Sequence, residues 1–140
     1  MSSREPLGVI GVGYVGLVTA VCFAKLGHSV VCVDVDRAKL ERLRRGEVPI
    51  YEPGTAEAMA ECGDLLRFSD DPVELFAHAQ IAFVCVDTPP SASGDADLSR
   101  VEAVIAALPQ SADGAVLVMK STVPVGTGAR ACVTCSTREA

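Results

Sequence analysis

The stretch that decides the fold runs from Leu7 to Asp36 and reads LGVIGVGYVGLVTAVCFAKLGHSVVCVDVD. An apolar run at its start leads into three glycines spaced G-x-G-x-x-G, namely Gly11, Gly13 and Gly16. A helix-like segment continues to Leu26, and a second apolar run ends at Asp34. A strand, a glycine turn, a helix, a strand and an acidic residue in this order are typical of a dinucleotide-binding unit.

Each glycine of this turn has a physical role in dinucleotide binding. Gly11 permits the tight turn out of the strand, Gly13 lets the backbone approach a pyrophosphate, and Gly16 lets the helix pack closely on the sheet. The start of the following helix offers unpaired N–H groups and a partial positive charge to phosphate oxygens. The turn therefore predicts a cofactor site at the end of the first strand.

Asp34 lies eighteen residues after Gly16, where a carboxylate accepts hydrogen bonds from the adenosine ribose hydroxyls. Its negative charge favours NAD over NADP, because a 2′-phosphate would meet a like charge there. The alternative is that Asp34 caps the helix that begins near Arg37.

The segment from Pro6 to Ala24 carries no charged residue, so a signal peptide or a membrane helix is an alternative. The preceding Arg4 and Glu5 make a poor positively charged leader. The glycines would weaken a spanning helix, and a second apolar strand follows at once. A β–α unit buried on both faces explains the same hydrophobicity.

Length and composition indicate a single aliphatic domain. The chain has 140 residues, no tryptophan and a net charge of −6, which argues against a nucleic-acid partner. We predict that Cys22, Cys32 and Cys85 are buried free thiols, and that the chain resides in a reducing cytoplasm without a membrane partner. Cys132 and Cys135 form a C-x-x-C that lacks the context of a redox or zinc site, so no metal site is predicted.

Strands and helices alternate after Asp34. We expect helices over 36–45 and 55–62, one beginning at Asp71 as N-cap, and one opened by a capping box at Ser99 and ending near 108. Strands are expected over 65–68, 81–86 and 115–119. The pattern predicts an α/β fold: a Rossmann-like, doubly wound parallel sheet of about five strands with helices on both faces.

In such a sheet all strands end along one edge, and a ligand lies across that edge at the switch point. The loops after the fourth and fifth strands therefore bring Asp87, Thr88, Ser121 and Thr122 towards the cofactor cleft. Ordinary turn chemistry is the alternative role for these residues.

Several separated motifs then match one family in order. They are GVGYVGL from Gly11, VDVD from Val33, IYEPG from Ile50, VDTP from Val86 and KSTVPVGT from Lys120. The chain resembles the N-terminal NAD-binding domain of the UDP-glucose/GDP-mannose dehydrogenase family, and most of all its members that oxidise UDP-glucose. The resemblance covers Leu7 to Arg130. We therefore expect an NAD-binding domain over 1–130 and a divergent tail over 131–140.

The resemblance implies that NAD contacts fall on the glycine turn, on the second strand's end, and on the loops after the fourth and fifth strands. The residues predicted to bind the cofactor are Gly11, Val12, Gly13, Tyr14, Val15, Gly16, Asp34, Lys39, Val86, Thr88, Pro89, Ser121 and Thr122. Lys39 has an alternative role as a solvated helix lysine. Thr122, near the nicotinamide, is a candidate accessory residue in catalysis.

The family oxidises the 6-hydroxymethyl group of a nucleotide sugar to a carboxylate with two NAD, through a thioester on a cysteine. None of the six cysteines here lies in that cysteine's motif, so no catalytic residue is predicted and the chain alone is expected to be inactive. The first hypothesis is a truncated enzyme whose central and C-terminal domains are absent and which binds nucleotide sugar only when completed by them. The alternatives are a non-catalytic NAD-binding module and a GDP-mannose-type dehydrogenase. Self-association and association with the missing half are the other expected partnerships.

Overall fold

Strands and helices alternate along the chain in the computed structural model, which describes residues 4–130. The predicted tail with Cys132 and Cys135 lies outside these residues. The elements are β1 (Leu7–Ile10), α1 (Tyr14–Lys25), β2 (Val30–Val33), α2 (Arg37–Arg44), α3 (Thr55–Cys62), β3 (Leu66–Ser69), α4 (Pro72–His78), β4 (Ile81–Val84), α5 (Ser99–Ala106) and β5 (Val116–Met119). Short 3₁₀ turns, Gly63–Leu65 and Gln110–Ala112, precede β3 and β5.

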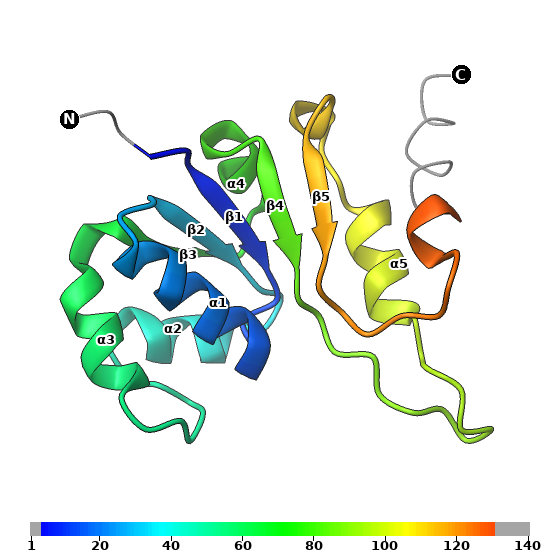
Figure 1. Cartoon of the computed structure of the whole chain (residues 1–140), viewed down its shortest axis with the longest axis horizontal. Coiled ribbons are helices and arrows are strands. Elements are labelled where there is room, and N and C mark those ends of the chain that lie inside the picture. The colour runs from blue at the N-terminus through cyan, green and yellow to red at the C-terminus, as the bar shows by residue number, and fades with distance from the viewer. Residues whose placement is uncertain (1–3, 131–140) are drawn as a thin grey trace.

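The five strands form one parallel sheet in the order β3-β2-β1-β4-β5. The chain starts in the middle at β1, winds outward to β3, and then returns to place β4 on the other side of β1 (Figure 1). Leu7 is therefore in register with Val30 on one side and with Ile81 on the other. The predicted doubly wound α/β fold is confirmed.

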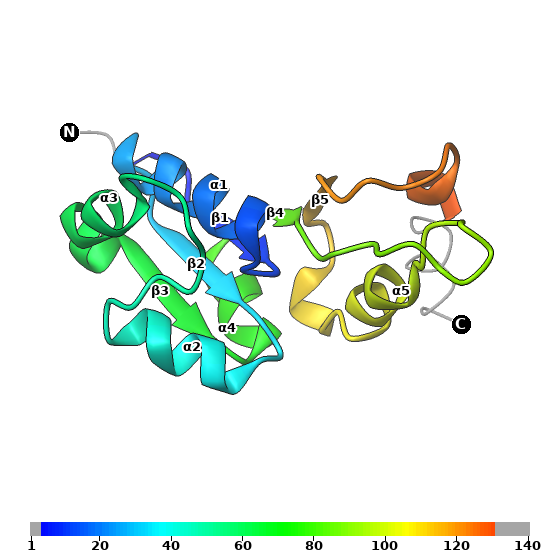
Figure 2. The same ribbon diagram turned by 90° about the horizontal axis from the view of Figure 1, so that it is seen from below.

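Helices cover both faces of the sheet, each over its own apolar cluster (Figures 1 and 2). On one face α1, α2 and α3 pack through residues such as Leu17, Leu40 and Met59. On the other face α4 contributes Leu75 and Phe76. All four residues of β1 are buried, as expected for a central parallel strand with helices on both sides.

The apolar positions of α1 follow helical spacing, and its buried residues are Gly16, Leu17, Ala20, Val21 and Ala24. Cys22 falls between these positions and is exposed, so its predicted burial is wrong. Cys32 and Cys85 are buried, as predicted. None of the helices within residues 4–130 has the length and apolar character needed to cross a membrane.

Side chains at the N-cap position mark the starts of α2 and α4. Asp71 accepts a hydrogen bond from the Val73 N–H and precedes Pro72, as predicted for α4. The capping box predicted at Ser99 is wrong. Leu98 is the N-cap of α5, and the Asp97 carboxylate accepts from the Ser99 N–H at 2.9 Å. The Asp97 side chain, one residue before the N-cap, thus accepts a hydrogen bond from one of the N–H groups that have no partner within the helix.

Candidate cofactor cleft

The turn after β1 can be built only with glycine at two positions. Gly11 has φ +93°, a left-handed conformation, and a Cβ there would lie 3.0 Å from the backbone of Cys85. A Cβ on Gly16 would lie 1.7 Å from the Gly11 carbonyl oxygen, a distance no side chain tolerates. Gly11 thus turns the chain, and Gly16 brings α1 against that turn.

Gly13 has space around it: the nearest atom to a Cβ there would be Asp87 Oδ1, at 3.6 Å. Gly13 is also the N-cap residue of α1 and offers no side chain to cap it. The first N–H groups of an α-helix have no partner within the helix. The backbone is therefore open to a close-approaching anion, and this cradle fits a dinucleotide diphosphate.

Asp34 is held by three donors at the end of β2. Its Oδ2 accepts from the Val12 N–H at 2.9 Å and from Lys39 Nζ at 3.1 Å. Its Oδ1 accepts from the Asp36 N–H at 2.9 Å. The carboxylate thus ties the glycine turn to the start of α2. The alternative role as helix cap is wrong, because Asp36 caps α2 by accepting from the Lys39 N–H at 3.0 Å.

These bonds keep Asp34 ionised although its side chain is only 9% exposed. Burial by itself would raise the pKa of this carboxyl, but the Asp36 and Val12 N–H groups and Lys39 together hold its pKa below the ordinary value. A fixed, charged acceptor at the strand end is what recognition of a ribose diol requires.

A cavity of about 510 Å³ opens at this edge of the sheet. Apolar lining comes from α5 and the residues directly after it, with Ala103, Val104, Ala107 and Leu108. Charged lining includes Asp34, Asp36 and Lys39 from the end of β2 and the start of α2. A flat apolar ring and a polar sugar-phosphate chain would suit these two kinds of lining respectively.

Five of the residues predicted to bind cofactor line this cavity, namely Gly11, Gly13, Asp34, Lys39 and Val86. Val12 is buried and contributes its N–H to Asp34. The residues of the predicted set that do not line the cavity are Val12, Tyr14, Val15, Gly16, Thr88, Pro89, Ser121 and Thr122. Tyr14 and Val15 are each about half exposed at the start of α1.

The predicted residues on the β4 and β5 loops hold those loops together. Thr88 Oγ1 donates to the Thr122 carbonyl at 2.7 Å, and Ser121 Oγ donates to the Val86 carbonyl at 2.6 Å. The structure thus brings these two loops side by side at the carboxyl ends of their strands.

Two contacts at this edge are absent from the sequence predictions. The Tyr14 hydroxyl donates to the Glu52 carboxylate, which ties the Tyr51–Gly54 loop to the glycine turn. Asp87 forms an ion pair with Arg100, and both line the cavity. In each case the partners are more than ten residues apart, so no local pattern could have paired them.

Cys85 also lines the cavity, but it is not a candidate nucleophile. Burial raises the pKa of its thiol, and a buried neutral thiol is unreactive. No group of three His, Cys, Asp or Glu side chains able to hold a metal ion exists within residues 4–130.

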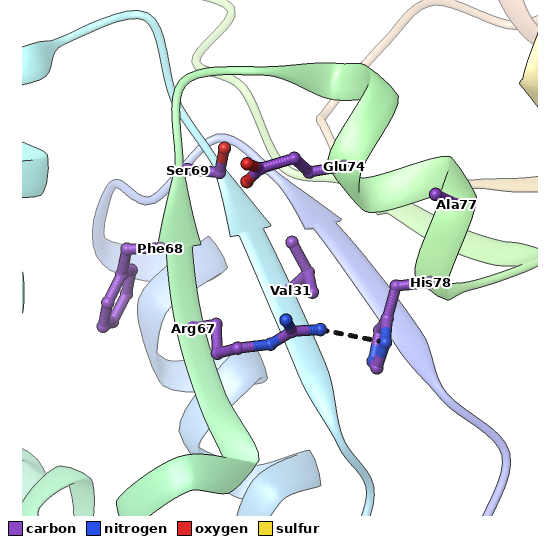
Figure 3. A pocket seen from close by; sticks show the side chains of 7 residues that line it. All are labelled: Val31, Arg67, Phe68, Ser69, Glu74, Ala77 and His78. Carbon is purple, nitrogen blue, oxygen red and sulfur yellow. Dashed lines mark hydrogen bonds between the residues drawn. The ribbon is translucent and has the colours of Figure 1, made fainter.

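A second cavity, of about 430 Å³, lies between β3 and α4 (Figure 3). Arg67 from β3 and His78 from α4 point towards each other across it, with Arg67 Nη2 3.0 Å from His78 Nδ1. His78 Nε2 lies 3.3 Å from the Ser29 carbonyl. No glycine is among the residues that line this cavity.

The parallel sheet, the glycine turn at its switch point and the fixed carboxylate after β2 define a dinucleotide-binding domain of the Rossmann type. The NAD-binding-domain model of the UDP-glucose/GDP-mannose dehydrogenase family matches residues 5–140. The chain belongs to this family and corresponds to its NAD-binding domain, so the predicted cofactor, NAD, is confirmed at the level of the family.

Individual relatives agree with this assignment. A UDP-glucose 6-dehydrogenase of Pseudomonas aeruginosa is 50% identical over 127 residues, which are 89% of this chain and 28% of that protein. A UDP-glucose dehydrogenase structure from Pyrobaculum islandicum aligns with a TM-score of 0.88 at 40% identity, covering 97% of this chain and 33% of that one. A ternary-complex structure of a Pseudomonas aeruginosa GDP-mannose dehydrogenase aligns with a TM-score of 0.87 at 30% identity, covering 94% and 31%. The chain thus spans about 28% of the length of the curated relative.

Proposed function

We propose that this chain is the cofactor-holding part of a dehydrogenase that oxidises UDP-glucose to UDP-glucuronate with two NAD. The observation that carries the proposal is the Asp34 carboxylate, held between the Val12 N–H and Lys39 beside an uncapped helix start. The higher identity to UDP-glucose relatives, 50% and 40% against 30% for the GDP-mannose dehydrogenase, supports UDP-glucose over GDP-mannose.

The residues have separate tasks in this proposal. Asp34 accepts hydrogen bonds from the adenosine ribose, the backbone from Gly13 to Val15 donates to the diphosphate, and the apolar lining from α5 covers the adenine. The predicted residues on the β4 and β5 loops, Thr88 and Thr122 among them, face the nicotinamide half. Bound NAD would accept a hydride from the carbon that is oxidised.

The nucleotide sugar requires the family's remaining domains as partners in this proposal. We expect the thioester-forming cysteine to lie in those domains. The low reactivity that burial gives Cys85 supports this division. Free Cys22, Cys32, Cys62 and Cys85 support the proposed cytoplasmic location.

Backbone amide chemical shifts of the ¹⁵N-labelled chain during titration with NAD test the cofactor assignment. We expect shifts at Gly13, Tyr14 and Asp34, because the diphosphate and ribose bind there. The amides of Arg67 and His78, beside the second cavity, serve as the internal control and should stay in place. Shifts confined to Arg67 and His78 would refute the assignment.

Incubation of the chain with UDP-glucose and NAD tests whether oxidation of the sugar needs the remaining domains. We expect no absorbance increase at the NADH wavelength above a blank without UDP-glucose. Turnover by the chain alone would show that the oxidising chemistry does not need the remaining domains.

A further inference from the structure

Arg100 and Gly13 both line the cofactor cleft. Arg100 is the second residue of α5, and its Nη1 lies 2.9 Å from Asp87 Oδ2. The other oxygen of the same carboxylate, Asp87 Oδ1, lies 3.6 Å from the position of a Cβ on Gly13. The guanidinium and the glycine turn therefore lie on two sides of one carboxylate.

The charges lining the cleft are unfavourable for a diphosphate. Four aspartates line it, Asp34, Asp36, Asp70 and Asp87, against two cations, Lys39 and Arg100. A diphosphate brings further negative charge into this lining, where like charges repel. Of these carboxylates, that of Asp87 lies beside Gly13. Arg100, which pairs with Asp87, therefore reduces the negative electrostatic potential next to the glycine turn.

The two cations, Lys39 and Arg100, differ in how exposed their ion pairs are and so in how available each is to bind a ligand. Lys39 is 27% exposed and is held against the 9% exposed Asp34. Arg100 is 58% exposed and its partner Asp87 is 71% exposed, so their ion pair contributes little to stability. A guanidinium has five N–H donors in a fork that matches phosphate, and it can hold a carboxylate and a phosphate oxygen together.

We infer that Arg100 binds the diphosphate of the cofactor beside the Gly13 turn, in addition to neutralising the Asp87 carboxylate there. This inference rests on the proposed cofactor site and adds a specific ligand-binding side chain to it. Arg100 is not among the residues that the sequence predicts to bind the cofactor, and its place in the cleft comes from the tertiary arrangement that pairs it with Asp87.

Calorimetric titrations with NAD, ADP and adenosine test the inference in low-salt buffer, where charge effects are least screened. The variants are Arg100→Gln, Asp87→Asn and the double variant. Arg45→Gln is the matched control, since Arg45 forms a comparable exposed ion pair with Glu47 at 3.2 Å outside the cleft. Thermal unfolding of each variant establishes that it is folded.

We expect Arg100→Gln to weaken NAD and ADP by about tenfold, the loss of a charge-assisted hydrogen bond, and to leave adenosine unchanged. Asp87→Asn should not weaken NAD, and the double variant should bind NAD about tenfold more weakly than Asp87→Asn. Arg45→Gln should bind like the wild type.

A double variant that binds NAD as tightly as Asp87→Asn would overturn the inference, because Arg100 would then only neutralise Asp87. Equal weakening of adenosine and NAD would also overturn it, because the effect would not pass through the diphosphate. A wild-type chain that binds neither NAD nor ADP would instead refute the proposed function itself, and the inference with it.

Discussion

The two halves of the cofactor cleft are built in different ways. On the β1–α1–β2 side the parts are buried and joined through the backbone: Gly16 lies against the Gly11 carbonyl, and the Val12 N–H is bound by Asp34. On the β4–α5–β5 side the contacts include the exposed Asp87–Arg100 pair, and β5 has no buried residue. The first half is fixed by close backbone contacts, whereas the second depends on hydrogen bonds and an ion pair made by side chains.

Gly16→Ala tests the steric half and should have the largest effect. The new Cβ would lie 1.7 Å from the Gly11 carbonyl oxygen, so the turn or the helix must move. We expect the free energy of unfolding, measured with denaturant, to fall by about 1–3 kcal/mol or more, with loss of NAD binding. The matched control is Gly128→Ala, because no atom lies within 4 Å of a Cβ at Gly128. Equal stability of the two variants would contradict a sterically fixed turn.

Asp34→Asn tests the electrostatic link within the same half. The charged acceptor of three hydrogen bonds is lost, so we expect a loss of about 1.5–3 kcal/mol in the free energy of unfolding at pH 7. Asp64→Asn, an exposed aspartate on the 3₁₀ turn before β3, is the control and should change stability little.

The Asp34 effect should depend on pH in a defined direction. The folded pKa of Asp34 lies below its ordinary value, so its charged form stabilises the fold fully above about pH 4, the ordinary range of Asp. The difference between wild type and Asp34→Asn should shrink as the pH falls through the lowered pKa. A difference that grows on acidification would contradict the assigned hydrogen bonds.

The sequence was most informative where local sterics decide. The glycine turn, α1, the cap at Asp71 and the parallel sheet follow from residue types at fixed spacing, and so does the position of Asp34. The partners Arg100 and Glu52 could not be predicted, because α5 and the Tyr51–Gly54 loop reach the edge only through tertiary packing. Cys22 was misplaced because it is apolar in type but lies off the buried face of α1.

Glu52→Gln tests the exposed hydrogen bond between Tyr14 and Glu52 and should have the smallest effect of these substitutions. The hydrogen bond to the Glu52 carboxylate, with its charge, raises the pKa of Tyr14. The chain has two tyrosines, so Tyr51→Phe leaves Tyr14 as the one that titrates. In that background we expect Glu52→Gln to lower the pKa of Tyr14. The titration is measured by the absorbance of tyrosinate. Glu57→Gln, an exposed residue of α3, is the control, and equal titration curves would rule out the contact in solution.

The most direct test of the central claim is a pair of calorimetric titrations of the chain with NAD and NADP. If Asp34 accepts the ribose hydroxyls, NAD binds at one site per chain, and NADP binds at least about tenfold more weakly because its 2′-phosphate meets the carboxylate. Equal affinity for the two cofactors, or tighter binding of NADP, would contradict the account.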